Sequence, residues 1–176
     1  MTLPDYLEIA QGTAIIWGHP GGSGVTHDIS VDNLTSGTAR MGAVADLNSP
    51  FSDEYLVFLR VETGTAPTNG TTVDVHLVSN YTTTAYPAKV SGVDLAYTLG
   101  SGDANLMQAG PPVTSLMVTA DTNTTLAQDG AIWRPAGRYV VPILVNRMNQ
   151  NIRNQGTPAN NTTRIILVPR RQTIVE

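Results

Sequence analysis

The chain contains no cysteine among its 176 residues. This absence excludes disulfides, thiolate zinc sites, iron–sulfur clusters and a cysteine nucleophile. A chain of this length is the size of one domain and can bury roughly 70% of the surface that its unfolded form exposes. Stability therefore does not require disulfides, and the sequence gives no sign of an oxidising compartment.

Long apolar runs are also missing. No stretch approaches the ~18 apolar residues of a membrane-spanning helix. The first ten residues, MTLPDYLEIA, carry two acids and a proline where a signal peptide would be basic and then apolar. The sequence predicts a protein made in the cytoplasm that neither crosses nor binds a membrane.

Charge is scarce. Charged residues make up 14% of the chain, against about 25% in ordinary soluble domains, and Lys89 is the single lysine among ten basic residues. Protein interfaces are depleted in lysine and retain arginine, so this composition favours a chain that works inside an assembly. A monomer with a nearly neutral surface is the open alternative. The net charge of −4 argues against non-specific nucleic-acid binding.

What the sequence does contain is alternation of apolar and polar residues at period 2, in stretches rich in Val, Ile, Thr and Tyr. Strands are predicted over 13–17, 39–47, 54–63, 73–79, 112–120, 124–134, 137–146 and 163–169. No stretch of a dozen residues has a clear apolar helical face. Because the connections are long and irregular, the pattern predicts an all-β, two-sheet antiparallel sandwich of jelly-roll type, with about eight strands and an extended N-terminal arm.

Phase and proline add detail to three strands. Pro142 cannot donate to a ladder and is predicted at a sheet edge or bulge. The following residues are predicted to share one face within 39–47 and within 54–63, respectively: Ala39, Ala43, Ala45 and Leu47; Tyr55, Val57, Leu59 and Val61.

The domain organisation follows from the same pattern. Residues 1–12 form the arm, 13–169 a single jelly-roll domain, and 170–176 a C-terminal tail. Residues 80–111 are polar, Gly-rich and too long for an ordinary connection, so we expect an excursion with a function or with little structure of its own. The Gly-rich stretch 18–28 is predicted to be a flexible loop.

Few residues suggest catalysis. His19 and His27 flank the Gly-rich loop at a spacing that no common metal motif uses, and His76 is predicted on a solvent face. The stretch HPGGSG lacks the lysine of a phosphate loop. We therefore predict no catalytic, cofactor-binding or metal-binding residue, and no enzyme.

Tyrosines of the excursion offer an alternative function. Tyr81, Tyr86 and Tyr97 all lie in 80–111, and loops carrying aromatic rings are common binding sites. A carbohydrate-binding jelly-roll module of a phage tail or fibre is the alternative hypothesis that these rings support.

The amide-rich stretch RMNQNIRNQGTPANNTT, residues 147–163, contains no acid. The arginines and amides of this stretch, together with Arg164, would suit hydrogen bonds to the carboxylates and backbone of a partner subunit. The other interpretation is a solvated flexible loop. The interface candidates here are Arg147, Asn149, Gln150, Asn151, Arg153, Asn154, Gln155 and Arg164. Three residues of the arm are further candidates: Tyr6, Leu7 and Ile9.

The chain contains the segments DEYLVFLRVETGTAPTNGTTVDVHL, WRPAGRYVVPILVN and IRNQGTPANNTTRIILVP. These segments resemble parts of the small jelly-roll capsid cement, or decoration, proteins of tailed bacteriophages. The resemblance covers roughly residues 38–79 and 112–169 and includes no catalytic signature. It implies a structural virion protein, a homotrimer on the outer capsid surface, which binds the major capsid protein and clamps neighbouring capsomers. The arm, the loop 18–28 and the stretch 147–163 would then make the contacts.

Overall fold

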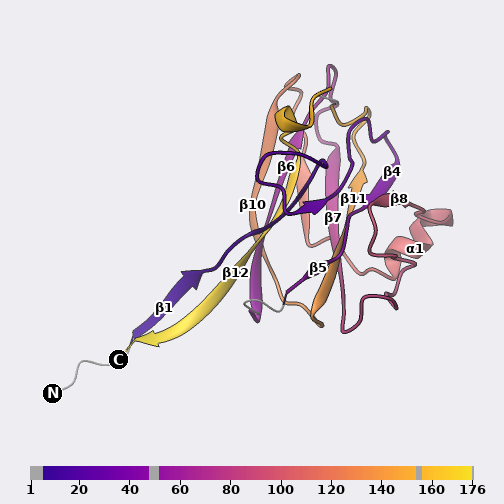
Figure 1. Cartoon of the computed structure of the whole chain (residues 1–176). Helices are drawn as coiled ribbons and strands as arrows, with labels where there is room; N and C mark the ends of the chain where they lie inside the picture. The colour runs from indigo at the N-terminus through magenta and orange to yellow at the C-terminus, as the bar shows by residue number, and fades with distance from the viewer. Residues whose placement is uncertain (1–5, 48–51, 154–155, 176) are drawn as a thin grey trace.

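The computed structural model describes residues 6–47, 52–153 and 156–175, and shows two mostly antiparallel β-sheets packed face to face (Figure 1). Sheet A contains, in order, β10 (Thr125–Trp133), β6 (Glu54–Glu62), β12 (Arg164–Val175), β2 (Ile15–Gly18) and β3 (His27–Asp28), and β1 (Tyr6–Gln11) pairs with β12. Sheet B contains, in order, β8 (Leu95–Tyr97), β4 (Thr38–Met41), β11 (Tyr139–Asn146), β7 (Thr72–Asn80) and β9 (Thr114–Met117), and β5 (Ala45–Asp46) pairs with β11. The predicted all-β sandwich is confirmed, and each predicted strand overlaps at least one observed strand.

The core lies between the two sheets and is built by alternation. Tyr55, Val57, Leu59 and Val61 of β6 are all buried in one apolar cluster, as their phase predicts. Sheet B contributes to the same cluster through Val73, Val75 and Leu77 of β7 and Val140 and Leu144 of β11. Period-2 spacing places every second side chain on the same face of a strand, which is why these positions could be identified from the sequence.

The prediction that Ala39 and Ala45 share one face of residues 39–47 is wrong, because a bulge lies between them. Ile143 pairs with Met41 and Val140 pairs with Ala45, so the partner strand advances four residues while β11 advances three. One extra residue reverses the faces. Ala39 therefore lies in a second apolar cluster, whereas Ala45 lies in the main core.

Pro142 explains that bulge. It lies in the middle of β11, which is a central strand between β4 and β7, so a sheet edge is wrong and the bulge is confirmed. Its carbonyl accepts from the Gly42 N–H at 2.9 Å. Because Pro142 has no N–H, a regular ladder to the neighbouring strand would lose a hydrogen bond here, and residues 42–44 leave the strand instead.

The excursion 80–111 covers the outer face of sheet B. It contains β8, a short 3-10 turn η1 (Ser101–Asp103) and one helical turn, α1 (Ala104–Met107). A second apolar cluster joins this segment to outward-facing residues of the sheet. Its buried members are Ala39, Met41, Val78, Ala88, Val90, Tyr97, Leu106, Val141, Ile143 and Val145.

Both ends of the described chain leave the sandwich together. β12 continues beyond its last pairing with β6, Arg170 opposite Glu54, and pairs with β1 from Gln11–Arg170 to Tyr6–Val175. We call this two-stranded segment, residues 6–11 and 170–175, the ribbon; Figure 1 shows it projecting from the sandwich. Residues 170–175 are thus a strand and not a tail, and the predicted arm is paired where it is described.

A second 3-10 turn, η2 (Pro158–Asn160), lies in the connection between β11 and β12. No helix among residues 6–47, 52–153 and 156–175 is long and apolar enough to cross a membrane.

Candidate interaction surface

The amide-rich connection between β11 and β12 is packed onto the end of the sandwich. Met148 and Ile152 are fully buried members of the main core. Asn146, also fully buried, donates from its amide nitrogen to the carbonyls of Leu34 and Gln150 at 2.7 and 2.9 Å. Buried apolar side chains and a satisfied buried amide fix the start of this connection, so a loop that is flexible throughout is not what the structure shows.

Two of the three predicted interface arginines have acidic partners in their own chain. Arg147 donates to Asp74 at 2.9 Å and to Asp103 at 2.7 Å, which joins β7 to η1. Arg153 donates to Glu62 at 2.7 Å. These partners lie far away in the sequence, which is why the stretch 147–163 appeared to lack carboxylates.

Arg164 is different. Arg164 is only 8% exposed, and its Nη1 donates to the Thr163 carbonyl at 2.8 Å. Among the described residues, no carboxylate lies within ion-pair distance of it. Arg60 lies directly opposite it on β6. Burial, and then the charge of Arg60, lower the pKa of Arg164, whereas Asp32 raises it. A Cβ at Gly18 or Gly22 would stand within 3 Å of its guanidinium nitrogens, so the Gly-rich loop can lie over this arginine only because it lacks side chains there.

Three of the predicted residues meet at a polar hollow of about 710 Å³ at this end of the sandwich: Gln150, Asn151 and Arg153. The Gln150 Oε1 accepts from the Ala66 N–H at 2.9 Å, and its Nε2 is buried with no hydrogen-bond partner in the described structure. The hollow is also lined by Asn33, Gly64, Thr65, Asn123 and Ile152. Asn149 is exposed outside it, and Asn154 and Gln155 lie outside the described residues.

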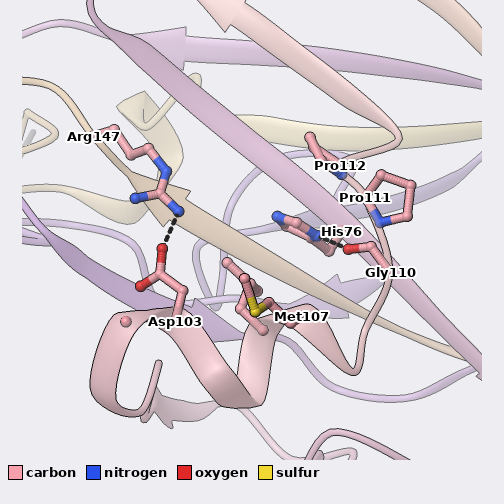
Figure 2. A pocket seen from close by; sticks show the side chains of 9 residues that line it. His76, Asp103, Met107, Gly110, Pro111, Pro112 and Arg147 are labelled. Carbon is pink, nitrogen blue, oxygen red and sulfur yellow. Dashed lines mark hydrogen bonds and ion pairs between the residues drawn. The ribbon is translucent and has the colours of Figure 1, made fainter.

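A second cavity, of about 390 Å³, lies between sheet B and α1 (Figure 2). In Figure 2, Arg147 reaches Asp103 on one side and His76 reaches the Gly110 carbonyl on the other, with Met107 below them. Its other lining is mostly apolar, from Leu106 and two prolines. The polar contacts of this cavity tie the excursion to the sheet.

His76 corrects a prediction. It is buried to 4% exposure and not on a solvent face, because the excursion covers this side of β7. Its Nδ1 lies 2.9 Å from the Gly110 carbonyl, so Nδ1 carries the proton and donates. Burial lowers the pKa of His76, although the bond to Gly110 acts in the opposite direction.

The other two histidines lie apart. His19 Nε2 is 3.3 Å from Asp32, and the His27 ring lies 5.6 Å from that of Trp17. Burial raises the pKa of Asp32 and lowers that of His27. Within the part of the chain that the structure describes, no three His, Asp or Glu residues are grouped to hold a metal ion.

The excursion tyrosines do not form a common shelf. Tyr97 is buried, and its hydroxyl donates to the Ala88 carbonyl at 2.7 Å. The hydroxyl of Tyr86 is buried without a hydrogen-bond partner among the described residues, and burial raises its pKa. Tyr86 as a whole is partly exposed, and Tyr81 is 77% exposed. The three rings therefore do not support the carbohydrate-binding alternative.

The outer face of sheet A carries apolar residues that were not among the predicted interface candidates. The register sets Ile166 opposite Phe58 and Ile16, and sets Leu56 opposite Val168 and Ile132. We call these six residues the sheet-A patch: Ile16, Leu56, Phe58, Ile132, Ile166 and Val168. All are partly or largely exposed, and none belongs to either apolar cluster. The signal was present, because apolar residues fill both phases of 54–63 and 163–169.

Of the predicted arm contacts, Tyr6, Leu7 and Ile9 all lie in β1 and therefore in the ribbon. The structure does not bring them near the stretch 147–163, since the ribbon leaves the sandwich on its own (Figure 1). No family model, no curated protein and no solved structure matches the chain.

Proposed function

We propose that this protein is a non-enzymatic structural component of a bacteriophage virion, a capsid cement protein that binds the outer surface of the head. In this role a homotrimer contacts the major capsid protein and clamps neighbouring capsomers. The proposal follows from the family resemblance of residues 38–79 and 112–169 and is supported by three features of the fold.

The first support is the strand order, from which we infer a jelly roll. If the short strands β1, β3, β5 and β8 are set aside, the remaining eight can be numbered one to eight along the chain. Sheet A then has the order 6-3-8-1 and sheet B the order 2-7-4-5. The chain changes sheet at every step except from the fourth of these strands to the fifth. This interleaving is the pattern of two Greek keys wrapped into a double sheet.

The ribbon is the single observation that carries the proposal. A two-stranded antiparallel pair is at best marginally stable in water when it stands alone, yet β1 pairs with β12 alone among the described strands. A segment of this kind is suited to contact a neighbouring molecule. On a shell with many equivalent sites, weak contacts of each copy add up by multivalency.

The paired arginines are the third support, and they revise the predicted contacts. Arg147 and Arg153 are occupied by carboxylates of their own chain, so the stretch 147–163 would contribute a rigid, amide-lined surface with Asn149 and Asn151 exposed. Amide groups donate and accept without the desolvation cost of unpaired charges. The ribbon and the sheet-A patch become the stronger candidates for contact.

The test is reconstitution on heads that lack the protein. We expect wild-type protein to bind purified heads, to appear in the icosahedral lattice by cryo-electron microscopy, and to raise the temperature at which the heads release DNA. A variant with Leu7 and Ile9 both replaced by serine should bind more weakly. Tyr81→Ser, a change at an exposed site outside the ribbon and the patch, is the matched control. Unchanged heat resistance of fully decorated heads would show that stabilisation is the wrong role.

A further inference from the structure

Two parts of this chain bring apolar residues together on one face through their strand register. The first is the sheet-A patch. Cross-strand neighbours on one sheet face lie about 5 Å apart, so the register of β2, β12, β6 and β10 makes the six residues contiguous. Ile132, at 56% exposure, is the most open of them.

The second surface is the outer half of the ribbon. The register sets Leu7 opposite Ile174 and Ile9 opposite Gln172. Residues that are opposite one another in an antiparallel pair share a face, as do residues two apart on one strand. Leu7, Ile9 and Ile174 therefore occupy positions on one face of the ribbon, and Tyr6 and Val175 occupy paired positions on the other.

These two surfaces cannot meet within one chain. The ribbon is the direct continuation of β12, a central strand of sheet A, past its last pair with β6 at Arg170. Figure 1 shows it running outward from the sandwich, in line with that strand. Folding back onto the patch would require β12 to break in the middle of a strand of twelve residues.

We propose that the ribbon of one copy lies on the sheet-A patch of a second copy. The contact joins two different surfaces, so it is heterologous, and copies joined in this way close into a ring when the rotation between them allows it. The occupant is a second copy because this chain supplies both halves of the contact: a ribbon that pairs with no other described strand and has Leu7, Ile9 and Ile174 at positions of one face, and an apolar sheet face. The inference rests on the proposed function, since it names the self-contact on which a cement assembly would depend.

The absence of cysteine from the chain makes the experiment direct. Leu7→Cys and Ile132→Cys are prepared as separate full-length proteins, the first with a longer tag, then mixed and oxidised. Non-reducing electrophoresis resolves a mixed dimer by its size. The control pairs Leu7→Cys with Met117→Cys, because Met117 is even more exposed, at 67%, but lies on β9 of sheet B.

We expect the mixed dimer with Ile132→Cys to form at least tenfold faster than the one with Met117→Cys. We also expect light scattering to show an oligomer for the wild type and a shift towards monomer for Phe58→Ser, with Met117→Ser unchanged. Equal cross-linking with the two partners, or a wild type that is monomeric at micromolar concentration, would overturn the inference.

The outcomes separate this inference from the cement role. A wild type that is monomeric in solution but still protects heads would refute the ribbon–patch contact and leave the proposed function standing. Specific cross-linking in a protein that does not bind heads would do the reverse.

Discussion

The outer faces of the two sheets differ in how far their apolar residues are buried. The outer face of sheet B is buried under the excursion 80–111, where Ile143 and Val141 are fully enclosed in the second apolar cluster. The outer face of sheet A has comparable residues, Ile166 and Phe58 among them, but they remain partly exposed. The chain thus covers the outer face of one of its sheets with its own polypeptide and leaves that of the other partly exposed.

That contrast separates stability from assembly. Residues on the covered face contribute to the free energy of folding of the single chain, because their apolar area leaves water when the chain folds. Residues on the open face contribute less to folding and keep apolar area available for association. Changes on the two faces should therefore have different consequences even when the residue type is the same.

The largest expected effect comes from a matched pair of isoleucines. Ile143→Ala, on the covered face, should lower the free energy of unfolding by about 3 kcal/mol, since it leaves a cavity in a closed cluster. Ile166→Ala, on the open face, should cost about 1 kcal/mol. Urea denaturation of dilute protein measures both. Equal losses would show that the sheet-A face is as closed as that of sheet B.

Asp94 provides the next test, because it ties the excursion to the rest of the chain. Its carboxylate accepts from Arg40 Nε at 2.6 Å and from the Ser30 N–H at 3.0 Å. Burial acts to raise the pKa of Asp94, but the hydrogen bonds from Arg40 and Ser30 outweigh it and the pKa is lowered. Asp94→Ala should cost about 2 kcal/mol at neutral pH, because it leaves buried donors unpaired.

The control for Asp94 is Arg134→Ala. Arg134 pairs with Glu54 at 2.7 Å, but its side chain is 76% exposed, so the loss should be about 0.5 kcal/mol or less. Since the folded-state pKa of Asp94 lies below the unfolded value, its contribution is present above that value and is lost as the pH falls through the folded pKa. A stability difference between wild type and Asp94→Ala that did not shrink in acid would contradict this assignment.

A smaller effect is expected at Tyr97. Tyr97→Phe removes one buried hydrogen bond, to the Ala88 carbonyl, and leaves the packing of the ring intact, so the loss should be about 1 kcal/mol. Tyr81→Phe, at an exposed ring, should leave the unfolding midpoint unchanged. Thermal denaturation of the two variants compares them, and similar midpoints would show that the Tyr97 hydroxyl is not needed to hold the excursion.

The smallest expected effect is a pH dependence due to His76. Burial lowers its pKa below 6.5 in the folded state, so the unfolded chain binds the proton more readily. The contribution of neutral His76 to the free energy of unfolding therefore has its full value above pH 6.5. It is lost as the pH falls through the folded-state pKa of this histidine. His76→Asn, which can keep a donor near Gly110, should make the unfolding free energy less dependent on pH below pH 6.5. An identical pH profile in the variant would exclude His76 as the cause.

Strand positions were predictable because their cause is local. In 54–63 the alternation of four apolar residues gave the correct inward face, and the turn chemistry around Asn69–Gly70 marked the connection to β7. Within 39–47 the predicted common face of Ala39 and Ala45 was wrong, because a bulge opposite Pro142 places these two residues on opposite faces. Proline on one strand and the accommodating residues on its neighbour are about a hundred positions apart, so no local window contains both.

The candidate interface could be predicted only as a set of residue types. The two arginines of 147–163 have no acidic partner within that stretch. In the folded chain, Asp74, Asp103 and Glu62 from other elements pair with them. His76 likewise has the alternation expected of a solvent-facing strand residue. It is buried because the excursion 80–111, which follows its strand, covers it. Which polar groups remain available to a partner is thus a property of the folded chain.

Composition and local period were sufficient to establish an all-β chain, to locate its main strands and to orient the interior of β6, since alternation in an extended backbone is a property of neighbouring residues. The pairing of β1 with β12, the covering of one sheet face and not the other, and the neutralisation of Arg147 and Arg153 depended on contacts between residues far apart in the sequence. The separation is 44 positions for Arg147 and Asp103 and 169 for Tyr6 and Val175. Such contacts arise when the sheets pack, because burial and ion pairing are set by distance in space.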